Sequence, residues 1–261
     1  MKVSIIIPAY NEEKRISNTL SSYYEFFKLI KKQKILDFEI LIVINNTKDR
    51  TEETVRDFCK KKKEIRYLNF KQGGKGFAVI EGFKDALKRE NDLIGFVDAD
   101  MSTSPEAYYD LIANIKNYDG IIASRYISGA KVSPKQSVQR IIASRIFNFM
   151  VRSLFLLSYR DTQCGAKLFK RETVKRILPK MGITQWAFDV DLLYLMKKSG
   201  KKIKEIPTIW MDKENSKLNL KKSSVQMFFS IIQLRMIYSF FKRFLKVIKP
   251  LVKKLYRFLN R

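Results

Sequence analysis

Residues 93–100 read LIGFVDAD, a short apolar run that ends in two aspartates separated by one alanine. A continuous apolar run of this length is typical of a buried strand, so Asp98 and Asp100 are expected just after a strand. Two carboxylates at such a place can hold one hard divalent cation, with substrate phosphates supplying further oxygens. The same spacing also occurs in ordinary acidic turns, so the motif needs support from its context.

Strand-like and helical runs alternate along the first half of the chain. The predicted strands are residues 3–7, 39–44, 65–70, 93–97 and 121–123, and the predicted helices are residues 12–30, 51–62, 76–89 and 105–116. This order predicts an α/β fold with a mostly parallel sheet and helices on both faces. Ligands of such sheets bind beyond the carboxyl ends of the strands.

Polar segments follow the predicted strands at the places where a ligand is expected. Residues 8–12 read PAYNE, residues 45–49 read NNTKD, and residues 72–76 read QGGKG before a helix. Glycines at a helix N-terminus expose backbone N–H groups to an anion, and Lys75 adds a positive charge. The glycine spacing matches neither the P-loop nor the dinucleotide-binding fingerprint, so an ordinary turn is equally consistent with this segment alone.

Composition limits the possible chemistry. The 261 residues include 52 Lys and Arg, 26 Asp and Glu, no histidine and two cysteines. His-based triads and a disulfide framework are therefore excluded, and acid–base or metal chemistry must use Asp, Glu, Lys or Tyr. Residues 197–261 carry eighteen basic and three acidic side chains. This basic tail predicts an anionic partner, such as phosphate, nucleic acid or a membrane surface.

Two predicted helices of the second half, residues 140–157 and 225–248, mix bulky apolar and basic side chains. That mixture favours helices lying in the membrane interface, although helices that cover a sheet have a similar composition. The chain has no apolar run of about 18 residues and no signal-peptide pattern, so we predict no transmembrane helix. We expect residues 1–220 to form one domain and residues 221–261 to form a basic segment at the membrane surface. We expect the protein as a whole to be a peripheral membrane protein at the cytoplasmic face.

Taken together, these motifs resemble the family 2 glycosyltransferases of the GT-A (Rossmann-like, nucleotide-sugar-binding) fold over residues 1–220. The most specific stretches are SRY at 124–126, DTQCGAKLF at 161–169 and WAFDVD at 186–191, which look like the dolichyl-phosphate glucosyltransferase branch. The resemblance implies an inverting transfer of a hexose to dolichyl or polyprenyl phosphate at the membrane surface. It further implies UDP-glucose as the donor and Mg²⁺ or Mn²⁺ as the cofactor.

The resemblance also implies roles for single residues. The expected nucleotide-sugar-binding residues are Pro8, Tyr10, Glu12, Asn45, Lys75 and Asp98. The expected metal ligands are Asp98 and Asp100. The expected acceptor-phosphate-binding residues are Arg125, Arg140, Ser144, Lys213 and Lys217. The expected catalytic residues are Asp98, Asp100, Arg125, Arg140 and Asp189. Asn45 stands where the family usually has an aspartate, and Ser102 stands where related mannose synthases have an amide ligand.

The expected mechanism depends on the acceptor. A lipid phosphate is already anionic and needs no general base, so positioning and charge neutralisation should supply most of the catalysis. The lipid phosphate would attack the anomeric carbon in line with the leaving diphosphate and invert the configuration of that carbon. A hydroxyl acceptor would need a base, for which Asp189 is the candidate. We expect Asp191 to be a solvated helix residue and Cys164 a packed residue rather than a nucleophile.

Two alternative functions are consistent with parts of the sequence. One is a family 2 transferase that acts on a glycan, a protein or another lipid hydroxyl. The other is a non-catalytic, basic nucleic-acid-binding protein, which the net charge of +26 favours. The chain shows no helix-turn-helix, zinc-finger or RNP pattern, so we expect no nucleic-acid partner.

Overall fold

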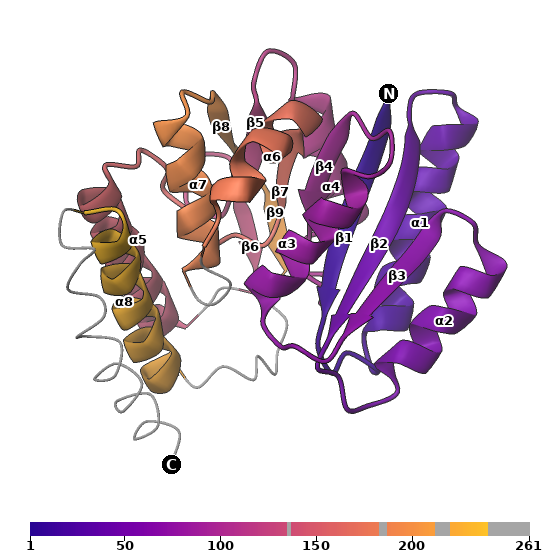
Figure 1. Ribbon diagram of the computed structural model, residues 1–261, viewed down its shortest axis with the longest axis horizontal. Helices are drawn as coiled ribbons and strands as arrows, with labels where there is room; N and C mark the ends of the chain where they lie inside the picture. The colour runs from indigo at the N-terminus through magenta and orange to yellow at the C-terminus, as the bar shows by residue number, and fades with distance from the viewer. Residues whose placement is uncertain (135–136, 183–186, 212–219, 240–261) are drawn as a thin grey trace.

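A seven-stranded sheet with the strand order β3-β2-β1-β4-β7-β5-β8 forms the centre of the protein (Figure 1). The structure is a computed structural model that describes residues 1–134, 137–182, 187–211 and 220–239. The strands are β1 (Lys2–Ala9), β2 (Asp37–Asn45), β3 (Ile65–Phe70), β4 (Leu93–Phe96), β5 (Gly120–Ser124), β7 (Lys167–Lys170) and β8 (Ile203–Pro207). Neighbouring strands are parallel except that β7 runs antiparallel to both β4 and β5. The predicted mostly parallel sheet is confirmed.

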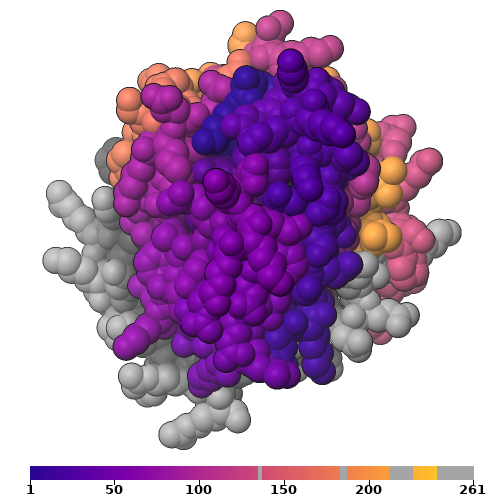
Figure 2. Space-filling view, turned by 90° about the vertical axis from the view of Figure 1, so that its right-hand side faces the viewer, coloured from indigo at the N-terminus to yellow at the C-terminus, as the bar shows by residue number. Residues whose placement is uncertain are grey.

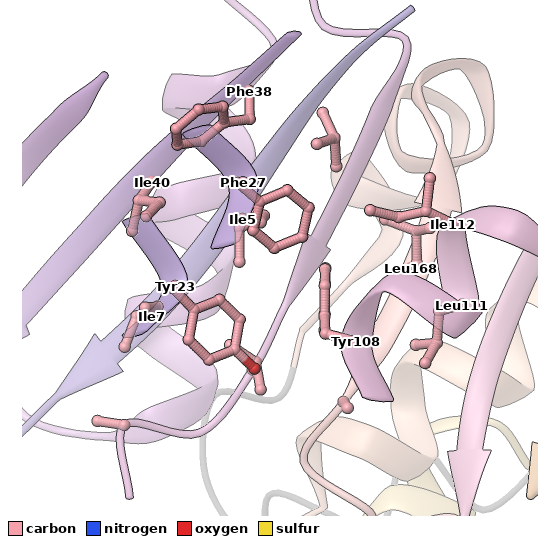
Figure 3. Close-up of a cluster of buried hydrophobic side chains, with 14 of the residues drawn as sticks. Ile5, Ile7, Tyr23, Phe27, Phe38, Ile40, Tyr108, Leu111, Ile112 and Leu168 are labelled. Carbon is pink, nitrogen blue, oxygen red and sulfur yellow. The ribbon is translucent and has the colours of Figure 1, made fainter. Parts of the chain in front are cut away.

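Helices cover both faces of the sheet, as the alternating pattern predicts. The helices on one face are α1 (Ile16–Lys32), α2 (Thr51–Lys61) and α4 (Pro105–Ala113), and those on the other are α3 (Lys75–Ala86), α6 (Arg171–Ile177), followed by a 3-10 turn (Leu178–Lys180), and α7 (Phe188–Lys198). Successive strand side chains point to opposite faces, so Ile5 and Ile7 of β1 pack with α1 while Ile6 packs with α3. Figure 3 shows Ile5 and Ile7 beside Tyr23 and Phe27 of α1.

The two ends of the sheet are built differently. At the β3 end, residues of the N-terminal half form most of the surface (Figure 2). At the other end, α5 (Val138–Phe155) and α8 (Leu220–Ile237) lie side by side (Figure 1). Both helices bury one side in the core that α3 and α7 share. The predicted helix 140–157 corresponds to α5, and the predicted helix 225–248 overlaps α8 as far as Ile237.

A small second sheet joins β6 (Lys131–Ser133) to β9 (Ile209–Met211) in parallel. Thr103 forms an antiparallel bridge with Trp210, and the Met211 N–H donates to the Ser102 carbonyl over 2.8 Å. The segment after β4 is therefore tied to the end of the chain's last described strand. None of the helices in the described ranges has both the length and the hydropathy needed to cross a bilayer.

The sequence does not predict β7, and it places the start of α1 too early. The four residues of β7, KLFK, begin and end with lysine and are too few for a periodic signal. The first helix begins at Ile16, not at the predicted residue 12, because Asn11 has a left-handed φ of 54° and residues 12–15 form a turn. As an antiparallel strand, β7 has its incoming loop at the edge where β4 and β5 have their carboxyl ends.

Candidate active site

The two aspartates after β4 lie where three segments of the chain meet. Asp98 forms an ion pair with Lys75, the first residue of α3, with 2.5 Å between Oδ1 and Nζ. The Asp98 carboxylate also lies so close to Gly165 that a Cβ at that position would overlap it. Any larger residue at 165 would displace either the loop before β7 or Asp98. The end of β4, the start of α3 and this loop therefore form one site.

Hydrogen bonds hold the turn that carries Asp98 and Asp100. The Ser102 N–H donates to Asp100 Oδ1 over 2.9 Å, and the Thr19 hydroxyl of α1 donates to the Ala99 carbonyl over 2.7 Å. Met101 between them has a left-handed φ of 60°, a conformation that non-glycine residues rarely adopt. Backbone of this kind persists where the surrounding structure enforces it, often at functional sites. The turn presents both carboxylates, each half-buried, in a fixed arrangement.

A second ion pair lies beside the first. Lys167 of β7 is fully buried, and its Nζ lies 2.7 Å from Asp189 Oδ1 and donates to the Cys164 carbonyl over 2.6 Å. The ammonium groups of Lys167 and Lys75 lie 5.4 Å and 5.9 Å from the centre of the Phe96 ring. A buried ammonium requires a carboxylate and hydrogen-bond acceptors, and Lys167 has both. The two lysines and their carboxylates therefore form one charged cluster.

The charges of this cluster suit a bound cation. Desolvation opposes the charged form of Lys75, but Asp98, Asp189 and Asp100 together hold its pKa above the ordinary value. The cluster contains these three carboxylates against the ammonium groups of Lys75 and Lys167, so it carries a net negative charge. Oxygen donors of this kind fit a hard divalent cation. Among the described residues no group of three His, Cys, Asp or Glu side chains forms a complete metal site. A cation held by Asp98 and Asp100 would therefore need substrate phosphates or water as further ligands.

A third ion pair forms where β5 ends. The Arg125 guanidinium binds Asp161 through two hydrogen bonds, of 2.7 Å from Nε and 2.9 Å from Nη2. Asp161 is fully buried and the Arg125 side chain is 11% exposed. Burial alone would raise the pKa of Asp161, but Arg125 lowers it below its ordinary value. The sequence predicts that Arg125 binds an acceptor phosphate, whereas the structure places two of its nitrogens on a protein carboxylate.

Aromatic rings connect Arg125 to α5. Its guanidinium carbon lies 5.2 Å from the ring centres of both Tyr126 and Trp210. The Tyr126 hydroxyl donates to Ser144 Oγ over 2.7 Å, and the exposed Arg145 guanidinium lies 4.5 Å from the same ring. The predicted residues Arg125 and Ser144 are therefore brought together through Tyr126, and Arg145 adds a cation that was not among the predicted site residues.

Asn45 lies at the end of β2 and is 2% exposed. Its Nδ2 donates to the Ala9 carbonyl and its Oδ1 accepts from the Gly74 N–H, both over 3.0 Å. Gly74 has a φ of 123°, which a side chain would disfavour. The structure thus shows Asn45 linking the end of β1 to the glycine-rich loop, an arrangement that positions Lys75.

The segment after β1 carries the other predicted nucleotide-binding residues. Pro8 pairs with β2 inside the sheet, and Tyr10 is half-exposed at its edge. Glu12 accepts two hydrogen bonds from the Arg15 guanidinium, of 2.7 Å and 2.8 Å, and its N–H donates to the Thr51 hydroxyl. These residues lie at the same sheet edge as Asn45 and Asp98. Lys213, Lys217 and Trp186 lie outside the described residues, and Arg140 lies half-buried in the first turn of α5.

The expectation for Asp191 is wrong. Asp191 is fully buried, accepts a hydrogen bond of 2.5 Å from the Tyr238 hydroxyl and accepts another from the Gly182 N–H over 3.2 Å. Tyr238, directly after α8, contacts the first turn of α7, and no local sequence pattern predicts that contact. No role was predicted for Asp161 or Lys167. A lysine within the apolar run GAKLF was a usable signal, because a buried lysine requires a carboxylate partner.

Cys164 is expected to resist thiol reagents in the folded protein. It is 1% exposed, and burial followed by the charge of Asp161 raises its pKa to about 11. Because the thiolate is the reactive form, iodoacetamide at pH 8 should modify it only after unfolding. Mass spectrometry of labelled peptides would measure this, with the half-buried Cys59 as an internal comparison. Equal labelling rates for the two cysteines in the native protein would contradict the packing of the 161–167 loop.

The chain is similar in sequence to one protein family and to named members of it. Residues 4–178 match the profile of glycosyl transferase family 2. A Dictyostelium discoideum protein named dolichyl-phosphate beta-glucosyltransferase is 35% identical over 246 residues, which are 90% of this chain and 74% of that protein. The human protein of the same name is 30% identical over 250 residues, which are 91% of this chain and 76% of that protein.

One solved structure shows how far the fold is shared. Glucosyl-3-phosphoglycerate synthase from Mycobacterium tuberculosis, in complex with Mn²⁺, uridine diphosphate and phosphoglyceric acid, superposes with a TM-score of 0.67. The match covers 90% of this chain and 78% of that one at 15% sequence identity. At this identity the likeness concerns the fold, and it confirms the fold class that the sequence predicts.

Proposed function

Because this chain belongs to glycosyl transferase family 2, we propose that it transfers glucose from UDP-glucose to dolichyl or polyprenyl phosphate with inversion of the anomeric carbon. The names of the Dictyostelium and human relatives support the sugar and the acceptor. The observation that carries the proposal is that the loop before β7, residues 161–167, joins two charged sites. Its Gly165 end lies against Asp98, which binds Lys75, and its Asp161 end binds Arg125.

Asp98 and Asp100 are the residues that would hold a divalent cation, Mg²⁺ or Mn²⁺. When bound, such a cation supplies charge neutralisation for a diphosphate leaving group. The Mn²⁺ and uridine diphosphate bound in the glucosyl-3-phosphoglycerate synthase structure support this assignment. Lys75 begins α3, and we expect its ammonium and the N–H groups of the first helical turn to bind the donor phosphates.

On the acceptor side we propose that Arg140 and Ser144 bind the lipid phosphate, together with Lys213 and Lys217. Arg125 would act there through its remaining nitrogen and by fixing Tyr126, whose hydroxyl orients Ser144. An anionic phosphate needs no proton removed before it attacks, so this site requires no general base. Asp189 then serves as the ion-pair partner of the buried Lys167. Catalysis would come from bringing donor and acceptor into line.

The transfer reaction tests this proposal directly. Purified protein should convert UDP-[¹⁴C]glucose and polyprenyl phosphate in neutral detergent into a chloroform-soluble labelled product. EDTA should abolish the product, and Mn²⁺ or Mg²⁺ should restore it. GDP-mannose in place of UDP-glucose is the matched donor control. A labelled product only on a glycan, protein or lipid hydroxyl would contradict the proposed acceptor and favour the other family 2 activity.

We further propose that α5 rests on the membrane surface. Val138, Ile142, Ile146 and Phe149 are exposed and recur every three or four residues, which places them on one stripe of the helix. An exposed apolar stripe on a helix with basic residues suits the boundary between lipid head groups and acyl chains. A polyprenyl acceptor stays in the bilayer, so an enzyme that uses it must reach that surface, and we place this enzyme at the cytoplasmic face.

The double substitution Ile142→Glu and Phe149→Glu should weaken binding to anionic vesicles, because two charges would have to enter the interface. Co-sedimentation with vesicles containing phosphatidylserine would measure the bound fraction, which we expect to fall by about an order of magnitude. Leu29→Glu, at an exposed position of α1, is the matched control. Equal sedimentation of the double variant and this control would contradict a role for the stripe.

A further inference from the structure

Asn148 of α5 binds the loop that precedes β7. Asn148 is 3% exposed, and Thr162 in that loop is fully buried. The Thr162 N–H and the Thr162 hydroxyl both donate to Asn148 Oδ1, each over 3.0 Å. Asn148 Nδ2 donates to the Ser144 carbonyl over 3.0 Å. Asn148 therefore holds the loop with its amide oxygen, while its amide nitrogen fixes the orientation of the side chain on the helix.

Side chains hold the backbone at the start of this loop. The N–H groups of residues 160–164 all donate to side-chain oxygens, which belong to Glu205, Asn148 and Asp161. Glu205 lies on β8 and Asp161 lies in the loop itself, so Asn148 is the one of the three that belongs to α5. A buried N–H that loses its acceptor carries a free-energy cost, so removing Asn148 should shift this part of the loop.

The face of α5 that carries Asn148 also carries residues proposed to bind the acceptor. Arg140, Ser144 and Asn148 follow one another at intervals of four residues, which places them on one face of the helix. The Ser144 hydroxyl is bonded to Tyr126, which follows β5. Within one helical turn, α5 is therefore tied to the end of β5 through Ser144 and to the loop before β7 through Asn148.

We propose that Asn148 is a positioning residue of the transfer reaction, which sets the acceptor-binding face of α5 against the loop before β7. This inference rests on the proposed function and deepens it. The same loop lies against Asp98 at Gly165, so the bonds from Thr162 to Asn148 link the acceptor side to the donor side. In-line attack depends on that spacing, and a displacement of about 1 Å can lower the rate about 100-fold.

The first test removes the amide. Asn148→Ala should lower kcat for transfer to polyprenyl phosphate by about 10- to 100-fold. The affinity for UDP should stay unchanged, because the ion pair of Asp98 with Lys75 is left intact. Calorimetric titration with UDP and Mn²⁺ counts the binding sites, and kcat is expressed per site. A merely structural role would reduce the number of sites and leave kcat per site unchanged.

The matched control removes a similar bond on the other face of the sheet. Asn114 lies at the C-terminal end of α4, and its Nδ2 donates to the Asp110 carbonyl four residues earlier, over 2.8 Å. Asn114→Ala therefore removes the same kind of bond within a helix, far from α5. It should leave both kcat per site and the affinity for UDP unchanged.

The second test changes the partner of Asn148. Thr162→Val keeps the shape of the side chain and the backbone N–H but removes the hydroxyl, so kcat per site should fall by about threefold to tenfold. Thr162→Ser keeps the hydroxyl and should keep the wild-type rate. In the double variant Asn148→Ala/Thr162→Val the loss should equal that of Asn148→Ala alone, because the hydroxyl has already lost its acceptor. The two Thr162 single variants also serve if Asn148→Ala folds poorly.

Three results would overturn the inference. These are a wild-type kcat per site in Asn148→Ala, additive losses in the double variant, and a Thr162→Ser variant as impaired as Thr162→Val. Failure of the wild type to transfer glucose to polyprenyl phosphate would instead contradict the proposed function. The same variants would then be compared on the donor and acceptor that the wild type does convert, with the same losses expected.

Discussion

Asp100→Asn is expected to lower kcat by about 10²- to 10³-fold, because the variant loses one of the two carboxylate charges proposed to hold the divalent cation. The asparagine Oδ1 can still accept the Ser102 N–H, so the turn after β4 should keep its shape. The melting temperature should therefore stay close to that of the wild type. Transfer to polyprenyl phosphate at saturating donor and metal, together with thermal unfolding by circular dichroism, would measure both quantities.

A surface aspartate provides the control for this experiment. Asp57→Asn, at an exposed position of α2, removes the same charge far from the site and should leave kcat unchanged. A titration with Mn²⁺ should show a weaker apparent metal affinity for Asp100→Asn alone. If Asp100→Asn retained both the wild-type rate and the wild-type metal dependence, the assignment of the D-A-D motif would be wrong.

Arg125→Met is expected to lower the free energy of unfolding by about 3–5 kcal/mol, because it leaves the carboxylate of Asp161 buried without its ion-pair partner. The double variant Arg125→Met/Asp161→Leu should recover much of this loss, since it removes both charges together. Urea unfolding of the wild type, both single variants and the double variant would measure the effect as a thermodynamic cycle.

The pH dependence of stability gives an independent measure of the same pair. Arg125 holds the pKa of Asp161 below its ordinary value, so the stabilisation is complete above the unfolded value of about 3.9 and is lost as the pH falls below it. In Arg125→Met, burial without the partner should raise the folded pKa of Asp161 above the unfolded one. That variant should therefore gain stability relative to the wild type as the pH falls from 7 towards 4.

This comparison also tests the role predicted for Arg125 from the sequence. If Arg125→Met were as stable as the wild type but no longer bound polyprenyl phosphate, the guanidinium would serve the acceptor rather than Asp161. Loss of stability with the expected pH dependence would make Arg125 a positioning residue. Its contacts with Tyr126 and Trp210 then explain how it shapes the acceptor side.

Elements with a strong local signal were predicted well. The strand Ile65–Phe70 has the predicted bounds, and α2 differs from its prediction by one residue. Runs of apolar and β-branched residues, and apolar residues at helical spacing, reflect local burial that needs no knowledge of distant contacts. The family match also displaces the alternative of a non-catalytic nucleic-acid-binding protein, which rested on net charge alone. Net charge describes the partners that a surface attracts and carries no information on fold or chemistry.

Ion pairs between residues far apart in the chain were not predicted. Arg125 meets Asp161 across 36 positions of the chain, and Lys167 meets Asp189 across 22. Asp191 was expected in solvent because helical spacing shows which residues share a face and not what covers that face. The covering residue, Tyr238, lies 47 positions further along the chain.

By itself, the sequence determined the alternating α/β architecture, the strand ends at which the polar motifs lie and the family to which the chain belongs. These follow from periodicity and from short motifs, both of which are local. Only the tertiary structure decided that β7 enters the sheet antiparallel between β4 and β5, and that its incoming loop therefore meets Asp98 and Arg125. The pairing of buried charges depends on which distant segments the fold brings within about 3 Å, a distance that spacing along the chain does not encode.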